Sequence, residues 1–241
     1  DLMKSGHIFT TNRDTEVIIH AYEEWGDHCI NMFRGMFAFA IWDNRLKRLF
    51  IARDRLGIKP LFYTINDNRL YFASEMKAFL CFSDINRAID DRALFAYFSL
   101  SYIPAPLSIF KNIYKLPAGH AMVVENGHLA INKYWDVEFT PDYSRDEGYF
   151  TNKFSELFDE SMKLRMISDV SIGAFLSGGI DSGLVVAQMS KLSPMPVHTF
   201  SMGFGGEVGG YLDERSYARL ISDKYKTEHQ EYEVLPDVKS I

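Results

Sequence analysis

Ser177-Gly178-Gly179-Ile180-Asp181-Ser182 follows an apolar run at residues 170–176 and leads into a helical pattern that extends to Leu192. Adjacent glycines allow a tight turn with unshielded backbone N–H groups, and the helix start adds free amides and a positive dipole end. The serines can donate hydroxyls to phosphate oxygens, and an aspartate fits beside a phosphate when Mg²⁺ bridges the two. This order predicts an anion site at the carboxyl end of a parallel strand.

A glycine pair alone is more often an ordinary turn, with the following aspartate as a plain helix cap. The complete hexapeptide, placed between a strand and a helix, favours the phosphate site over that interpretation.

The segments around this loop alternate between helices and strands. We expect helices at 146–167 and 213–225 and strands at 170–176, 197–202 and 230–234, with the first strand buried. The first helix has an apolar stripe formed by Phe150, Phe154, Leu157, Phe158, Ser161 and Leu164. A glycine-rich loop at 203–210 leads to the helix expected at 213–225. The order predicts a parallel sheet with right-handed crossovers.

The first half has a different pattern. Asp14 is predicted to cap a helix that ends at Gly26. The apolar run 36–42 predicts a strand buried on both faces. Further strands are expected to form an antiparallel meander, with a short helix and a second helix after them and then a hairpin across Asn126-Gly127. These strands are at 48–52, 59–65 and 69–73, the helices at 74–80 and 91–98, and the hairpin at 120–134. Asp90 or Asp91 is expected to cap the second helix.

Composition narrows the class of protein. The chain has 241 residues, 47% of them hydrophobic and 24% charged, which indicates one or two globular domains. Its net charge of −6 does not favour a polyanion-binding surface. No apolar run approaches the roughly 20 residues of a membrane helix. Cys29 and Cys81 are too few for a disulfide scaffold or a zinc cluster, and they predict a reducing cytoplasm.

The hexapeptide resembles the pyrophosphate loop of the ATP pyrophosphatase superfamily, which cleaves ATP between the α- and β-phosphates, and it lacks the lysine of a Walker loop. The first half resembles the glutaminase domain of class II amidotransferases in residues 14–18, 35–43, 52–61 and 72–75. Both patterns on one chain, in this order, resemble glutamine-hydrolysing asparagine synthetase. Lys115-Leu116-Pro117-Ala118-Gly119-His120 is similar to that family as well.

This resemblance implies two incomplete domains. Residues 1–137 would be the C-terminal portion of an α+β N-terminal-nucleophile-type glutaminase domain with antiparallel sheets. Residues 138–145 would be a linker. Residues 146–241 would be the N-terminal portion of an α/β, parallel-sheet domain of the adenine-nucleotide α-hydrolase-like, ATP pyrophosphatase type. The family's N-terminal cysteine nucleophile has no counterpart here, so we expect an internal portion of a longer synthetase that is inactive by itself.

The resemblance also implies a reaction. In the family, ammonia released from glutamine passes to the second domain, where ATP and Mg²⁺ activate aspartate as an aspartyl-adenylate that ammonia converts to asparagine. The expected partners are therefore glutamine, aspartate and ATP, with ATP and Mg²⁺ as cofactors. A homodimer is left open, and no nucleic acid or membrane is expected as a partner.

Site residues are carried over by position. Asp14 is implied to hold the glutamine α-ammonium group, although its role as a cap is physically adequate by itself. The residues implied to bind ATP are Leu176, Ser177, Gly178, Gly179, Asp181, Ser182 and Met202, and Asp181 is also the expected Mg²⁺ ligand. From the apolar pattern alone, Leu176 and Met202 would be core residues.

Other polar and thiol groups receive structural interpretations. Arg53, Asp54 and Arg55 are interpreted as an ion-pair network or a charged turn. Asp213-Glu214 is interpreted as a helix cap and dipole partner. Cys29 is interpreted as a small packing residue, and no catalytic residue is assigned to the chain.

Two alternatives remain. A related amidotransferase or β-lactam synthetase-like enzyme would adenylate a different carboxylate through the same loop. A degenerate amidotransferase would be a non-catalytic binding or regulatory module, although the intact loop argues against loss of the nucleotide site.

Overall fold

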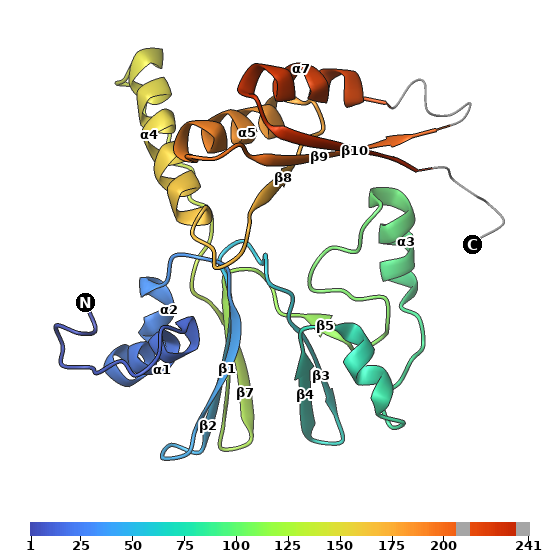
Figure 1. The fold of residues 1–241 in the computed structure, drawn as a ribbon. Coiled ribbons are helices and arrows are strands. Elements are labelled where there is room, and N and C mark those ends of the chain that lie inside the picture. Colours follow the sequence, from blue (N-terminus) through green and yellow to red (C-terminus); the bar gives the residue numbers. More distant parts are fainter. Residues whose placement is uncertain (206–212, 235–241) are drawn as a thin grey trace. The chain divides into compact units, whose positions relative to one another are not determined.

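The computed structural model describes residues 1–205 and 213–234, and the chain divides into two compact units, Asp1–Phe139 and Thr140–Ile241 (Figure 1). Each unit is described by itself. None of the described helices is both long and apolar enough to cross a bilayer.

The first unit contains two antiparallel sheets (Figure 1). One has the order β1-β2-β6-β7 and consists of Ala38–Asp43, Arg48–Arg53, His120–Glu125 and His128–Lys133. The other has the order β4-β3-β5 and consists of Arg69–Ala73, Phe62–Asn66 and Tyr114–Lys115. The predicted strands and hairpins therefore exist, but the single meander is wrong, because the chain leaves the first sheet after β2 and returns to it at β6.

Helices cover the outer faces of these two sheets. On the first sheet lie α1 (Asp14–Trp25), the 3₁₀ turn η1 (Gly26–His28) and α2 (Cys29–Met32). On the second sheet lies the 3₁₀ segment η2 (Met76–Cys81), which stands where a short helix was expected. The helix α3 (Asp91–Leu100) begins as predicted, with the Asp90 carboxylate accepting the Arg92 N–H. The result is a helix–sheet–sheet–helix arrangement of layers.

Burial on both faces belongs to β2 rather than to β1. Phe50 and Ala52 pack under α1 and α2, whereas Ile51 points the other way and packs with Leu61 and Leu116 between the sheets. The strand β1 lies at the edge of its sheet, and Trp42 is 57% exposed. The expectation of a doubly buried strand at 36–42 is therefore wrong, because an apolar run does not by itself distinguish an edge strand from a central one.

A buried carboxylate organises the loop that follows β2. Asp54 is 1% exposed and accepts N–H groups from Phe37, Leu56, Ile58 and Lys59 at 2.9 to 3.3 Å. Its backbone exchanges further hydrogen bonds, donating to the Phe37 carbonyl and accepting from Gly119. The expected ion-pair network is thus replaced by a charge that is satisfied by backbone donors.

The neighbouring Arg53 binds backbone carbonyl groups, whereas Asp54 binds backbone N–H groups. Its guanidinium donates to the carbonyls of Gly57, Lys59 and Leu116 at 2.5 to 2.8 Å. Burial lowers the pKa of Arg53 from its ordinary value. Arg53 and Asp54 therefore bind the carbonyl groups and the N–H groups, respectively, of the same loop.

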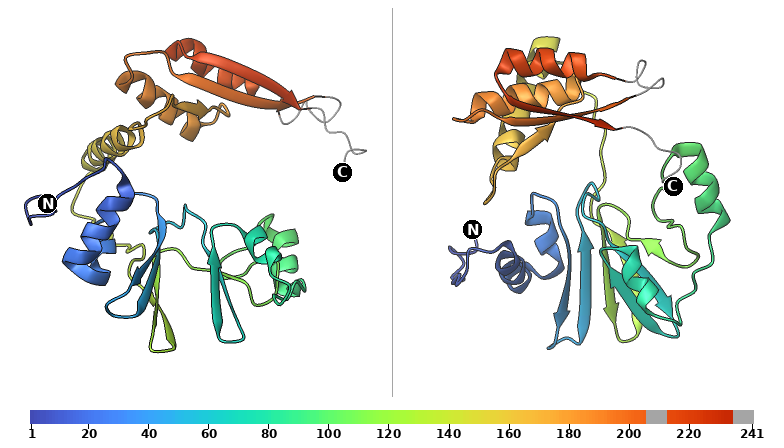
Figure 2. Two further views of the ribbon diagram at one scale, coloured as in Figure 1. Left: turned by 60° about the horizontal axis from the view of Figure 1, so that its bottom comes forward. Right: turned by 45° about the vertical axis from the view of Figure 1, so that its right-hand side comes forward.

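The second unit is a parallel α/β layer, as predicted. Its sheet has the order β10-β9-β8, all parallel. In chain order the elements are α4 (Glu147–Arg165), β8 (Gly173–Phe175), α5 (Ile180–Leu192), β9 (His198–Phe204), α7 (Arg215–Tyr225) and β10 (Glu228–Val234). Val186 of α5 and Ala218 of α7 pack with Leu176, so both helices cover one face of the sheet (Figure 2). The predicted loop 203–210 lies outside the described residues from position 206 onward.

Among the described residues 140–205 and 213–234, side chains on the opposite face of this sheet are exposed. Phe175 is 81% exposed, and its ring lies 6.4 Å from that of Phe200. The strand β8 spans Gly173–Phe175 and is shorter than the predicted 170–176. Because Phe175 is exposed, β8 is also not buried as expected. On α4, Met162 is buried against Met189 and Val197, whereas much of the predicted stripe (Phe150, Phe154, Leu157 and Leu164) is exposed.

Replacing Asp54 by alanine should lower the free energy of unfolding of the first unit by about 3–5 kcal/mol, because several buried N–H groups lose their acceptor. Urea unfolding followed by tryptophan fluorescence measures the loss. The control is Asp91→Ala, since that carboxylate is exposed and forms a surface ion pair with Lys111 at 3.5 Å. Equal losses in the two variants would contradict a central role for Asp54.

Candidate functional site

The loop between β8 and α5 is a tight turn built on Gly178. This glycine has φ +87°, and a Cβ placed on it would lie 2.7 Å from the Tyr217 Cβ and 2.9 Å from the Ala218 nitrogen. Only a residue without a side chain allows the loop to approach the start of α7 this closely. Gly179 precedes α5 with ordinary extended geometry and offers no side chain to cap the helix.

The two loop serines face each other. The hydroxyls of Ser177 and Ser182 lie 3.0 Å apart, and the Ser182 hydroxyl also donates to the Gly179 carbonyl at 3.2 Å. The Ser177 hydroxyl accepts a long hydrogen bond from the Gly179 N–H at 3.4 Å. Both hydroxyls therefore lie at the mouth of the turn, close to the amides of the first turn of α5.

Asp181 is exposed in the first turn of α5 and has no hydrogen bond or ion pair within residues 1–205 and 213–234. A plain helix cap would instead accept a first-turn N–H, and no such bond forms. Uncapped amides, two hydroxyls and a free carboxylate at a helix start fit a phosphate held with a divalent cation.

Leu176 directly follows β8, and Met202 lies in the adjacent strand β9, two residues before its carboxyl end. Leu176 is buried, its N–H donates to the Phe200 carbonyl and its own carbonyl accepts the Ser201 hydroxyl at 2.6 Å. Met202 is 64% exposed on the open face of the sheet, so its interpretation as a core residue is wrong. The structure thus brings Leu176 and Met202 toward the carboxyl end of the sheet, where the loop also lies.

A polar network behind the loop was not recognised in the sequence. His229 on β10 lies between the hydroxyls of Thr199, at 2.9 Å, and Ser201, at 3.3 Å. Through Ser201 the network reaches the Leu176 carbonyl just before the loop. Alternate polar residues on a half-buried strand are the only sequence signal for it, and that pattern is common.

At the start of α7, the Asp213 carboxylate accepts the Arg215 N–H at 3.1 Å and pairs with the Arg215 guanidinium. These hydrogen bonds hold the pKa of Asp213 at about 2. The N-cap residue of α7 is Glu214, whose side chain makes no cap hydrogen bond, and Asp213 just before it accepts the first N–H of the helix instead.

Asp14 does not cap α1. The residue before the helix is Arg13, and no side chain caps the helix. The Glu16 carboxylate instead accepts N–H and hydroxyl groups from Thr10 and Thr11, which lower its pKa to about 2. The Asp14 carboxylate is exposed, with one long hydrogen bond from the Thr15 hydroxyl at 3.4 Å.

Asp14 lies on the wall of a cavity of about 440 Å³ in the first unit. The cavity is also lined by Lys59 and Ser74 and by the segment that begins β1, residues 36–39. A carboxylate and an ammonium in one small cavity suit a ligand with both charges, such as an amino acid. Lys59 and Ser74 lie within the segments that carried the resemblance, but they were not selected individually.

Neither cysteine lies in this cavity. Cys29 is fully buried beneath α1, as expected for a packing residue, and burial raises the pKa of its thiol to about 11. Cys81 is exposed at the end of η2. A buried thiol with a raised pKa is a poor nucleophile.

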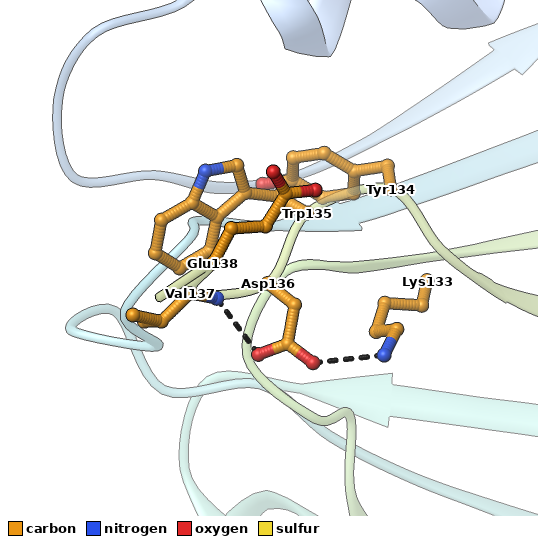
Figure 3. A pocket seen from close by; sticks show the side chains of 6 residues that line it. All are labelled: Lys133, Tyr134, Trp135, Asp136, Val137 and Glu138. Carbon is orange, nitrogen blue, oxygen red and sulfur yellow. Dashed lines mark hydrogen bonds and ion pairs between the residues drawn. The ribbon is translucent and has the colours of Figure 1, made fainter. Parts of the chain in front are cut away.

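A larger hollow of about 820 Å³ lies along residues 133–138 (Figure 3). There the Asp136 carboxylate accepts hydrogen bonds from the Lys133 ammonium at 2.8 Å and from the Val137 N–H at 2.9 Å. It contains none of the predicted site residues. Because the Lys133 ammonium and the Asp136 carboxylate are paired with each other, the size of the hollow alone gives it no function.

Replacing Gly178 by alanine should cost the second unit about 2–4 kcal/mol of unfolding free energy, because of left-handed strain and the close contacts with α7. Gly179→Ala is the matched control, since an added Cβ there would meet the Ser177 hydroxyl oxygen at an ordinary 3.5 Å. Denaturation followed by circular dichroism compares the variants. Similar stabilities would show that the loop is not held against α7.

Two known families match this chain, one in each of its two compact units. The family described as "Glutamine amidotransferase domain" matches residues 1–135, and the family described as "Asparagine synthase" matches residues 153–238.

Curated relatives extend over both units. A protein named putative asparagine synthetase [glutamine-hydrolyzing] 2, from Methanocaldococcus jannaschii, is 40% identical over 92% of this chain and 43% of its own length. Asparagine synthetase [glutamine-hydrolyzing] 3 of Bacillus subtilis is 37% identical over 85% of this chain and 34% of its own length. A Gibberella zeae protein named amidase chry2 is 34% identical over 89% and 34%, respectively. The chain thus spans less than half the length of these relatives.

The first match covers more than half of the chain and coincides with the layered first unit, whereas the second lies within the parallel α/β unit. The chain therefore belongs to the glutamine amidotransferase family, and its residues 153–238 match the family described as "Asparagine synthase".

Proposed function

We propose that this chain takes part in the synthesis of asparagine from aspartate, with glutamine as the nitrogen donor and ATP as the activating substrate. The observation that carries the proposal is the Ser177–Ser182 loop, with its free Asp181 carboxylate, on the same chain as an amidotransferase unit. The relatives' names support the same reaction class.

In the second unit, the loop would hold the pyrophosphate portion of ATP. The glycine turn and the start of α5 supply amide donors, and Ser177 and Ser182 supply hydroxyl donors. Asp181 would hold Mg²⁺, which neutralises phosphate charge. The backbone of Leu176 and Met202, toward the carboxyl ends of β8 and β9, would line the nucleotide site.

Cleavage of ATP between the α- and β-phosphates suits amide formation. The oxygen of a free carboxylate is a poor leaving group, whereas the AMP of an aspartyl-adenylate leaves readily when ammonia attacks. Enclosure of the ammonia would prevent its loss to water. We place the reaction in the cytoplasm, because Cys29 and Cys81 are both free thiols.

In the first unit, Asp14 would hold the α-ammonium group of glutamine, with Lys59 across the same cavity facing the α-carboxylate. The buried Cys29 does not suit attack on the amide, and Cys81 does not line the cavity. We therefore assign no nucleophile to this chain.

A second candidate is amide formation with a different carboxylate. The similarity to a protein named as an amidase, at nearly the same identity as the synthetases, favours keeping it. A panel of carboxylates in the exchange assay described next separates it from aspartate activation.

Asp181→Ala should abolish the Mg²⁺-dependent, aspartate-dependent exchange of ³²P-pyrophosphate into ATP by the protein at its native length, because the metal ligand is lost. Glutamine hydrolysis should be unaffected, and Asp223→Ala, an exposed change on α7, should leave exchange intact. Unchanged exchange in Asp181→Ala would remove this residue from the metal site.

Asp14→Asn should lower kcat/KM for glutamine hydrolysis by about 10- to 100-fold, mainly through KM, because a charge-assisted hydrogen bond to the substrate is lost. Initial rates of glutamate release at native length measure this effect. The control Asp67→Asn lies in the β3–β4 turn, at φ +47°, which asparagine tolerates. If both variants kept the KM for glutamine of the unmodified protein, Asp14 would have no role in binding.

A further inference from the structure

Two histidines and a glutamate converge beside α1, away from the cavity that contains Asp14. The Nδ1 atoms of His7 and His20 lie 3.2 Å apart. The Glu23 carboxylate oxygen lies 2.9 Å from the His20 Nδ1 and 3.7 Å from the His7 Nδ1. His20 and Glu23 share one face of α1 at a spacing of three residues, whereas His7 comes from the segment before the helix.

These three separations fit the ligands of one small cation. In a tetrahedral zinc site with metal–ligand distances of about 2.0–2.1 Å, any two ligand atoms lie roughly 3.3 Å apart. The observed values scatter around that edge length. Both imidazoles are largely buried, with side-chain exposures of 16% and 19%, so their rings are held in place.

Each ring has a carboxylate beside its Nε2 atom, within hydrogen-bond distance for His7 and beyond it for His20. The His7 Nε2 lies 3.2 Å from Glu24, and the His20 Nε2 lies 3.8 Å from Glu16. Metal-binding histidines commonly donate their second N–H to a carboxylate in this way.

With the ring protons on the Nε2 atoms, three lone pairs point at one another. The Nδ1 atoms of His7 and His20 and the Glu23 oxygen then repel each other unless a proton or a metal ion lies between them, and their spacing also suits a metal ion. From this geometry, we propose that His7, His20 and Glu23 bind a divalent transition-metal ion of the Zn²⁺ class, with water as the fourth ligand. Two imidazoles and one carboxylate favour this class over Mg²⁺, which prefers oxygen ligands.

Such a site would be structural. It would connect the segment at His7 to the middle of α1, while Glu16 holds Thr10 and Thr11 between them. The ion would therefore close the loop that leads into Asp14, independently of the reaction proposed for the protein.

The test is a titration of the tag-free, chelator-treated chain with Zn²⁺ in competition with a chromophoric chelator, repeated with Co²⁺ to read its visible d–d bands. One Zn²⁺ per chain, tetrahedral Co²⁺ bands and no displacement by excess Mg²⁺ are expected. His20→Gln and His7→Gln should both lose this binding, and Glu24→Gln should weaken it about tenfold.

The matched control is His28→Gln, an exposed histidine in η1 that lies outside the cluster, and it should bind Zn²⁺ like the unmodified chain. Circular dichroism checks that the variants fold. If His20→Gln unfolds the protein, His7→Gln decides, since His7 precedes the helix. Failure of the native chain to compete for Zn²⁺, or undiminished binding in His7→Gln, would overturn the proposal and leave a shared proton between the rings.

Discussion

The first unit depends on the hydrogen bonds that the buried Asp54 carboxylate accepts from the backbone. A charge that is almost completely buried is stable only when donors surround it, and here the donors are backbone N–H groups from the start of β1 and from the loop after β2. Because Arg53 binds carbonyls of the same loop, the backbone between them has little freedom. The arrangement fixes Phe37 and Lys59, which line the cavity with Asp14.

The second unit solves a comparable problem without a buried charge. Its loop is positioned by the close approach of Gly178 to α7 and by Ser201, which ties the last residue before the loop to β9. The hydroxyls of Thr199 and Ser201 are hydrogen-bonded within the sheet, whereas Asp181 at the start of α5 is exposed and unpaired among the described residues. The polar groups behind the loop are hydrogen-bonded to one another, whereas the Asp181 carboxylate in front of them is not. This contrast makes the carboxyl end of the sheet the best candidate for a nucleotide site.

Features determined by neighbouring residues were predictable from the sequence. The Asn126-Gly127 turn, the Asp90 cap and the strand–loop–helix order around Gly178 follow from local backbone chemistry, and all are present. Features determined by distant residues were not. The cap predicted at Asp14 does not form, because Asp14 is itself the first residue of α1 and no side chain caps this helix. The strand β1 is exposed because of its place in the sheet, and His7 meets Glu23 only after the chain folds back on α1.

The contact between Gly178 and α7 has an evolutionary consequence. The atoms that exclude a side chain at Gly178 are the Tyr217 Cβ, the Ala218 nitrogen and the Glu214 carbonyl oxygen. Nearly every amino acid would supply these same atoms. Substitutions in the first turn of α7 therefore cannot compensate for the loss of the glycine, whereas the glycine tolerates almost any of them. Selection should act on one partner alone, so that the helix diverges among descendants of this sequence while position 178 stays fixed.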